Sequence, residues 1–341
     1  MTLPTRPGVA VRKPTPADPT SPAIIARALA KEFSSGIKAL ESVDFAVYPG
    51  EVFAYLGRNG SGKTTTVRIL TTLTSPTSGT ASVAGYDVVV APHEVRHRIG
   101  ASMQEIGLDP IMTGREHLEL SSGLWGLTRS DRGKRARELL EFFGLVEHAD
   151  RSIASYSGGM QRRLDLATAF ITEPPILFLD EPTAGLDPQS RRALWGEIRR
   201  LRADGTTVFL TTQYLEEAET LADHVAVLDR GSVAARGSIG ELKAAYGATR
   251  VEFRLADPGS MDDLRHALNG HEVTPIEGSD ALVIRVPGRA APSVVDIVAR
   301  VRDRGFALSG VAVREPTMED IYVELTGSEI TRSSDTARGS Q

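Results

Sequence analysis

Short apolar runs alternate with stretches of helical spacing through the first two thirds of the chain. Uninterrupted apolar runs predict buried strands, and apolar residues three and four apart predict helices. The predicted strands are Val52–Leu56, Ile176–Leu179 and Thr207–Leu210, and the predicted helices are Thr64–Leu73, most of 115–145, 159–170 and Arg191–Arg202. Alternating apolar residues between Ile24 and Val47 predict further strands, and Val88–Val90 predicts a buried strand or packing segment. This order predicts an α/β domain with a largely parallel core sheet.

A second domain is indicated by a change of composition after Tyr246 and Gly247. The apolar pattern beyond it predicts the order strand, helix, strand, strand, helix, strand, which is compatible with a small ferredoxin-like α+β module. A last helix is expected near Thr317, because Asp320 three residues later completes a capping box. The expected organisation is a disordered Pro-rich tail at 1–22, a first domain at 23–246, an accessory domain at 247–327 and a disordered tail at 328–341.

Composition narrows the class of protein. Hydrophobic residues make up 41% and charged residues 24% of the 341 residues, which is typical of a soluble globular protein. The net charge is −5 and no domain is strongly basic, so nucleic acid is not expected as a partner. Cysteine is absent, which excludes disulfides and thiolate chemistry. No apolar run approaches the roughly 18 residues of a membrane span, so any such spans are expected in another chain.

The clearest chemical motif is a glycine-rich loop between a predicted strand and a predicted helix. It consists of Gly57, Arg58, Asn59, Gly60, Ser61, Gly62, Lys63 and Thr64, followed by Thr65. The spacing is that of the P-loop, whose backbone amides and helix N-terminus bind phosphates. Lys63 is expected to reach the β- and γ-phosphates and the Thr64 hydroxyl to bind Mg²⁺. A glycine-rich turn without a ligand would need this pattern to arise by chance, which happens in roughly one in a hundred chains of this size.

Three further segments follow the P-loop. They are Tyr156-Ser157-Gly158-Gly159-Met160-Gln161, Ile176-Leu177-Phe178-Leu179-Asp180-Glu181 and Pro182-Thr183-Ala184-Gly185-Leu186-Asp187. Taken alone, the first is most simply a helix N-cap and the second a buried strand before a solvated acidic pair. In this order they resemble the signature, the Walker B strand and the D-loop of the ABC ATPase family. The resemblance implies a P-loop NTPase fold with an antiparallel β subdomain and a helical subdomain.

The family resemblance also implies roles for single residues. Asp180 would hold Mg²⁺ through water, and Glu181 would polarise the attacking water as general base. Ser157, Gly158 and Gly159 would contact the nucleotide of a second protomer, and Asp187 belongs to the loop that crosses the dimer interface. Gln104 stands at the place of the Q-loop glutamine, which touches Mg²⁺ and water. Phe33 resembles the aromatic residue on which adenine stacks, with a core phenylalanine as the alternative.

Several positions depart from the common family pattern. Arg58 stands where proline is frequent, and Tyr156 and Met160 replace leucine and glutamine of the signature. Gln213 occupies the position of the switch histidine. Its amide can donate a neutral hydrogen bond to the γ-phosphate, and neutral bonds are about half as strong as charge-assisted ones. Hydrolysis is therefore expected to persist at a lower rate.

These departures and the segment Arg314–Gly327 resemble the daunorubicin-type drug-resistance exporter ATPases. The resemblance implies a homodimer that binds ATP and Mg²⁺ and hydrolyses ATP at the cytoplasmic face of the membrane, as a peripheral protein. It would drive export of a drug, antibiotic or lipid-like compound through a separate integral membrane permease. An importer ATPase, a soluble ABC ATPase for DNA repair or translation, and a small-molecule kinase are the alternatives.

Overall fold

The computed structural model describes residues 21–256, 261–268, 272–275, 281–287 and 291–327. Both tails that were predicted to be disordered therefore lie outside the described residues, apart from Ser21 and Pro22. The described residues form two compact units, which divide after Arg236. The helix α8 (Ile239–Tyr246) belongs to the second unit, whereas the composition of the sequence placed the boundary after it.

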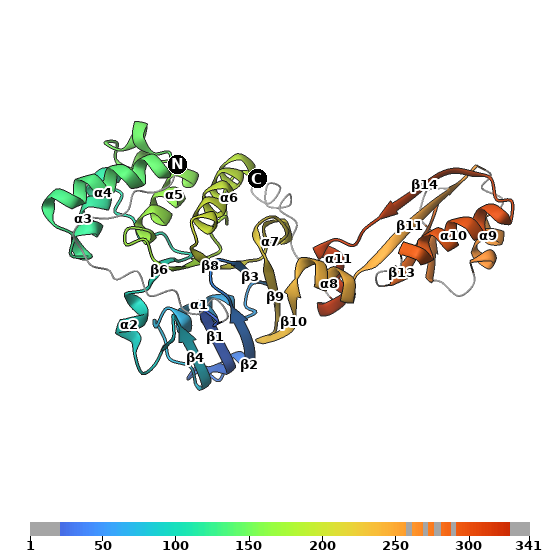
Figure 1. Ribbon diagram of the computed structural model, residues 1–341, viewed down its shortest axis with the longest axis horizontal. Coiled ribbons are helices and arrows are strands. Elements are labelled where there is room, and N and C mark those ends of the chain that lie inside the picture. The colour runs from blue at the N-terminus through green and yellow to red at the C-terminus, as the bar shows by residue number, and fades with distance from the viewer. Residues whose placement is uncertain (1–20, 257–260, 269–271, 276–280, 288–290, 328–341) are drawn as a thin grey trace. The chain divides into compact units, whose positions relative to one another are not determined.

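A six-stranded sheet lies at the centre of the first unit (Figure 1). Its strands, in the order β10-β9-β3-β8-β7-β6, are Ser232–Ser238, His224–Asp229, Val52–Gly57, Thr207–Thr212, Ile176–Asp180 and Ile99–Ser102. The strand β3 is parallel to β8 and β9, and β7 is parallel to β6 and β8. The predicted parallel core sheet is confirmed.

Alternate residues of the central strands enter two separate cores, which explains why these strands are apolar throughout. On one face Phe53, Tyr55 and Phe209 pack with Phe45 of β2, with ring centroids 5.5–5.7 Å apart. On the other face the strands pack against the helices. The strand residues in this second core are Val52, Leu177, Leu179, Val208 and Leu210.

An antiparallel sheet of order β2-β1-β4-β5 covers the first face. Its strands are Lys38–Val47, Ile24–Glu32, Ser78–Val83 and Tyr86–Asp87, and the helices that accompany it are α1 (Lys63–Leu70) and α2 (Pro92–Arg96). The sheet confirms the expected antiparallel β subdomain. The interpretation of Val88–Val90 as a buried segment is wrong, because Val88 is buried but Val89 and Val90 lie exposed in a turn.

Helices form the opposite side of the first unit, as expected for a helical subdomain (green in Figure 1). They are α3 (Gly114–Leu124), α4 (Arg129–Phe142) and α5 (Gly158–Ala169), with 3-10 turns at Val146–His148 and Ile153–Ser155. Thr113 and Glu116 form a capping box at the start of α3. Two more helices, α6 (Pro188–Ala203) and α7 (Leu215–Leu221), follow the strands β7 and β8.

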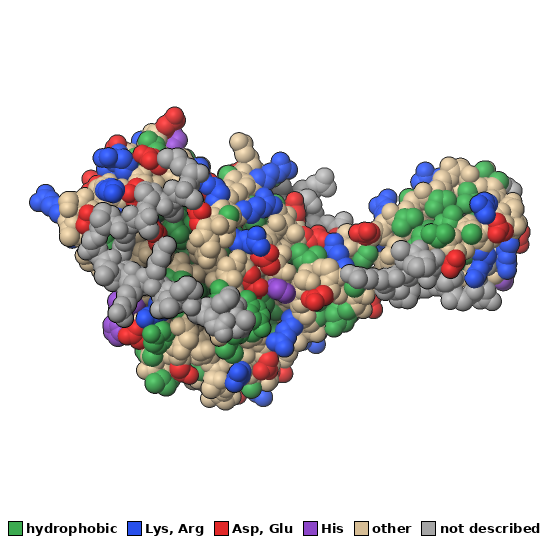
Figure 2. Space-filling model, viewed as in Figure 1, with side chains coloured by type: hydrophobic (Ala, Val, Ile, Leu, Met, Phe, Trp, Pro, Cys, Tyr) green, Lys and Arg blue, Asp and Glu red, His purple; other side chains and the backbone are tan. Residues whose placement is uncertain are grey.

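Basic side chains gather over α6 (Figure 2). The exposed arginines of this helix are Arg192, Arg199, Arg200 and Arg202. Arg200 pairs with Glu197 and Arg202 with Asp223, while Arg199 donates to the carbonyl of Thr220. Since three of the four arginines have protein partners, we interpret this surface as the solvated face of a helix.

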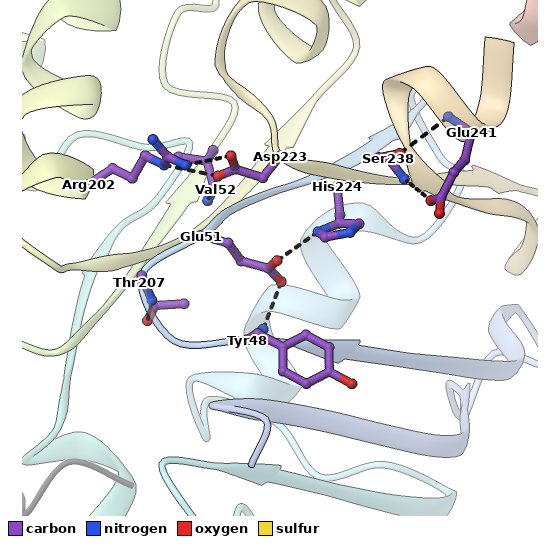
Figure 3. A network of polar contacts seen from close by, with 10 residues as sticks. Tyr48, Glu51, Val52, Arg202, Thr207, Asp223, His224, Ser238 and Glu241 are labelled. Carbon is purple, nitrogen blue, oxygen red and sulfur yellow. Dashed lines mark hydrogen bonds and ion pairs between the residues drawn. The ribbon is translucent and has the colours of Figure 1, made fainter. Parts of the chain in front are cut away.

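Polar contacts fix the amino ends of the central strands (Figure 3). The amide of Val52, which opens β3, donates to Asp223 at 2.9 Å, and Arg202 binds both oxygens of the same carboxylate at 3.0 and 2.6 Å. Beside it, Glu51 contacts the Nδ1 atom of His224 at 2.7 Å. These side chains occupy the amino edge of the sheet, opposite the carboxyl edge from which the P-loop leaves β3.

The second unit is built on a four-stranded antiparallel sheet of order β12-β13-β11-β14. Its elements are β11 (Ala248–Leu255), α9 (Met261–Ala267), β12 (Glu272–Pro275), β13 (Ala281–Pro287), α10 (Ala291–Asp303), β14 (Leu308–Arg314) and α11 (Met318–Thr326). The predicted order of strands and helices is confirmed, as is the capping box of Thr317 and Asp320. Within the described residues, no helix of either unit is long and apolar enough to cross a membrane.

Candidate nucleotide-binding site

Four predicted site segments leave the central sheet at its carboxyl edge. The P-loop follows β3, Gln104 follows β6, Glu181 follows β7, and Gln213 follows β8. Parallel pairing aligns the strand ends, with Leu56 opposite Thr212 and Asp180 opposite Thr211. Since β8 lies between β3 and β7, the topology brings residues far apart in sequence to one edge.

The P-loop backbone requires glycine at several points. Gly62 has φ of +108°, and a Cβ atom there would lie 2.4 Å from the carbonyl oxygen of Ala39. Gly60 has φ of +81°, and a Cβ atom on Gly57 would lie 2.5 Å from the Ser61 hydroxyl. The helix α1 that follows has no side-chain cap and no acidic residue in its first turn. Its first amides therefore lack intrahelical acceptors and favour an anion.

Lys63 is buried and held at three points. Its Nζ atom donates to the carbonyls of Gly57 at 2.8 Å and Arg58 at 3.0 Å, and lies 3.0 Å from Oε1 of Glu181. Only 3% of Lys63 and 8% of Glu181 is exposed, so each charge compensates the other in a site with little water. The structure thus joins the P-loop directly to Glu181, the residue that follows β7.

The acidic pair occupies two different environments. Asp180 is fully buried, and its Oδ1 atom accepts a hydrogen bond of 2.5 Å from the Thr211 hydroxyl. Its Oδ2 atom has no hydrogen-bond partner within the described residues. Glu181 has φ of +49°, an uncommon conformation for a residue with a side chain, and its amide donates to the carbonyl and hydroxyl of Thr211. A buried, unpartnered carboxylate oxygen and the Thr64 hydroxyl in the first turn of α1 are ligands of the hard type that Mg²⁺ prefers.

The remaining nucleotide-site candidates are more accessible. Gln104 is exposed and Gln213 half-buried. Phe33 lies in the turn between β1 and β2 with 42% of its surface exposed, and the Lys31 ammonium lies 5.3 Å from its ring centroid. The alternative that Phe33 is a core residue is therefore wrong. The next strand, β2, approaches the P-loop through Leu40, whose side chain is 2.7 Å from the position of a Cβ on Gly62.

In this chain the signature segment begins the helix α5. The Ser157 hydroxyl accepts a hydrogen bond from the amide of Met160 at 3.3 Å, so it serves as the N-cap. A Cβ atom on Gly159 would lie 2.5 Å from the hydroxyl of Ser190, so close packing against α6 requires glycine there. Ser157 and Gly158 are exposed and available to a second molecule.

Tyr156, one of the departures from the family pattern, has a structural explanation. Its side chain is buried, and its hydroxyl donates to the carbonyl of His148 at 2.7 Å. A Cβ atom on Gly114 would lie 2.4 Å from the same hydroxyl. Tyrosine therefore connects the residues just before α5 to the 3-10 turn Val146–His148 through a hydrogen bond that leucine could not make.

We expect Tyr156→Phe to lower the free energy of unfolding by about 1–2 kcal/mol, because it leaves the His148 carbonyl without its donor. Urea unfolding followed by circular dichroism measures the change. Tyr48→Phe is the control, since Tyr48 is 45% exposed, and it should change stability by less than about 0.5 kcal/mol. Equal stabilities of the two variants would contradict the assignment.

Asp187 has a local function besides the one predicted. Its Oδ1 atom accepts from the amides of Gln189 and Ser190 at 2.9 Å each, and the Ser190 hydroxyl donates to Oδ2. These bonds hold the pKa of Asp187 below its ordinary value, the Ser190 hydroxyl having the largest effect. Within one chain, Asp187 is the N-cap of α6.

Two buried charged residues beside the site were not singled out from the sequence. Arg162 lies on α5, and Glu217 lies on α7, where its Oε1 atom accepts from the indole N–H of Trp195 at 2.9 Å. Burial raises the pKa of Glu217. Helical spacing could have identified both, because Arg162 shares a face with Leu166 and Glu217 with Leu221, and both leucines are buried.

A glycine-rich loop between a parallel strand and a helix, with its lysine beside the acidic residue that follows another strand of the same sheet, defines a P-loop nucleotide-binding domain. Comparison with known proteins narrows the class: residues 40–184 match the family described as ABC transporter. The chain belongs to this family as one of its ATP-binding subunits.

Relatives and solved structures agree with this assignment. The chain is 39% identical over 310 residues to the doxorubicin resistance ATP-binding protein DrrA of Mycobacterium tuberculosis, covering 89% of this chain and 93% of the relative. It is 43% identical over 292 residues to the daunorubicin resistance ATP-binding protein DrrA3 of Streptomyces coeruleorubidus, covering 86% and 92%. A dimeric ATP-binding cassette solved with ADP and Pi is 27% identical, with a TM-score of 0.59, covering 63% of this chain and 98% of that structure.

Proposed function

We propose that this chain binds ATP with Mg²⁺ and hydrolyses it to drive export of a drug, antibiotic or lipid-like compound through a separate membrane permease. The observation that carries the proposal is the convergence of Lys63, Glu181 and Asp180 at the start of an uncapped helix. The direction of transport is supported by relatives named for daunorubicin resistance, linearmycin resistance and Nod factor export.

In the proposed mechanism the phosphates replace the Glu181 carboxylate as the partner of Lys63. The amides of Gly57–Thr65 and the Lys63 ammonium bind the β- and γ-phosphates, while Phe33 stacks on adenine. Glu181, released from Lys63, accepts a proton from the attacking water, and Gln213 donates its amide to the γ-phosphate. Thr64, Asp180 and Gln104 would hold Mg²⁺, partly through water. Bound Mg²⁺ neutralises charge on the phosphates.

We further propose that two copies of the chain form the working ATPase. Ser157, Gly158, Gly159 and Asp187 of one copy would complete the site of the other, which agrees with the exposure of Ser157, Gly158 and Asp187. The dimeric cassettes among the solved structures support the arrangement. The dimer would lie against its permease at the cytoplasmic face of the membrane. The strand order of the second unit supports a ferredoxin-like module.

The test is a pull-down from membranes of the native host. Glu181→Gln with ATP and Mg²⁺ should retain an integral membrane protein in stoichiometric amount, and Lys63→Ala should retain less of it. Loss of the chain from the host should then raise sensitivity to the compound that this permease exports. Recovery of only soluble proteins or nucleic acid would overturn the export proposal in favour of a soluble ABC ATPase. Lower uptake of a nutrient, without any change in efflux, would indicate an importer.

A further inference from the structure

The guanidinium of Arg162 contacts three motifs of the site at once. Only 3% of Arg162 is exposed. Its Nη2 atom donates to the carbonyl of Asp180 at 2.9 Å, and its Nε atom to the carbonyl of Pro182 at 2.9 Å. Its Nη1 atom donates to the carbonyl of Met103 at 2.7 Å. The first two carbonyls lie on either side of Glu181, and the third immediately precedes Gln104.

A second layer of contacts holds Arg162 itself. Asp165, one turn further along α5, lies 3.5 Å from the guanidinium, and its Oδ2 atom accepts from the Ser102 hydroxyl at 2.5 Å. Ser102 is the last residue of β6. Burial raises the pKa of Asp165 and lowers the pKa of Arg162, and each charge opposes the shift of the other. The pair thus connects α5 to the carboxyl ends of β6 and β7.

Only arginine can make this set of contacts. Its planar group offers five N–H donors in fixed directions, whereas a lysine ammonium is a compact charge with three. Arg162 also adds a second positive charge near the acidic residues of the site, besides the Lys63 ammonium that pairs with Glu181. The side chain therefore balances the acidic pair as well as holding its backbone.

We propose that Arg162 is a positioning residue that fixes Glu181 and Gln104 relative to the signature helix. The inference rests on the proposed roles of Glu181 and Gln104 in ATP hydrolysis. Each nitrogen of the Arg162 guanidinium donates to a backbone carbonyl. Arg162 holds the backbone on both sides of the general base, so its loss displaces Glu181 while the P-loop keeps its own contacts.

The experiment compares Arg162→Lys with Arg163→Lys in the full chain. Arg163 is a matched control, because it lies on the same helix and its guanidinium donates at 3.2 Å to the carbonyl of Phe143 in the helical subdomain. ATP turnover, the affinity for a fluorescent ATP analogue and thermal stability are measured for each. Arg162→Lys is expected to lower kcat about 10- to 100-fold with little change in nucleotide affinity. Arg163→Lys is expected to change neither kcat nor nucleotide affinity.

Asp165→Asn is a second variant, which preserves the shape of the side chain but removes the charge that holds Arg162. Asp165→Asn should also lower kcat, by a smaller factor than Arg162→Lys does. A kcat for Arg162→Lys equal to that of Arg163→Lys would overturn the inference. So would a loss of nucleotide affinity in proportion to kcat. Failure of the proposed function would give a different result from failure of this inference, because Glu181→Gln would then hydrolyse ATP at the rate of the parent chain.

Discussion

Glu181→Gln is expected to lower kcat for ATP hydrolysis about 10²- to 10⁴-fold, the usual contribution of a positioned general base. The amide has the same shape but cannot take the proton of the attacking water. Nucleotide affinity should rise at the same time, because the carboxylate that pairs with Lys63 at 3.0 Å no longer competes with the phosphates. Phosphate release and equilibrium binding of ATP measure the two effects, and gel filtration with ATP should show an increased fraction of dimer.

Glu216→Gln provides the control for this prediction. Glu216 is exposed on α7, so the substitution makes the same change of charge at the surface of the same unit. It should leave turnover and affinity unchanged. If Glu181→Gln retained the kcat of the parent chain, Glu181 would not be the base. If kcat fell but affinity did not rise, the pair with Lys63 would not compete with the nucleotide.

The strands and the P-loop could be predicted because their signals are local. Val52–Leu56 and Ile176–Leu179 are apolar throughout, and both became central strands buried on two faces. The positions of Lys63 and Asp180 then followed from topology, since parallel strands end at the same edge. The start of α11 at Thr317 could be predicted for the same reason, because the capping box of Thr317 and Asp320 lies within four residues.

The contacts of the site could not be predicted because they join distant segments. Nothing near Lys63 in the sequence indicates that it pairs with Glu181, since the contact depends on the order of the strands. Arg162 is a stronger example, because its three partners are backbone carbonyls, which every residue type carries. The hydrogen bond of Tyr156 to the His148 carbonyl could not be predicted for the same reason, since its acceptor is also a backbone carbonyl.

Lys63→Ala is expected to weaken ATP binding and to destabilise the fold, for separate reasons. Charged hydrogen bonds contribute about 1.5–3 kcal/mol each, so losing one with the phosphates should raise the Kd about 10- to 150-fold. The variant also leaves Glu181 buried without its cation, and breaking a buried pair costs about 3–5 kcal/mol.

Combining Lys63→Ala with Glu181→Gln separates these two effects. The neutral glutamine needs no cation, so the double variant should recover most of the unfolding free energy that Lys63→Ala loses. It should still bind ATP weakly, because the phosphates lack their ammonium. Calorimetric unfolding and equilibrium binding of an ATP analogue give both quantities for the four proteins of the cycle. Additive stability changes would mean that the Lys63–Glu181 pair contributes nothing to the stability of the fold. An unchanged Kd for Lys63→Ala would mean that Lys63 does not bind the nucleotide.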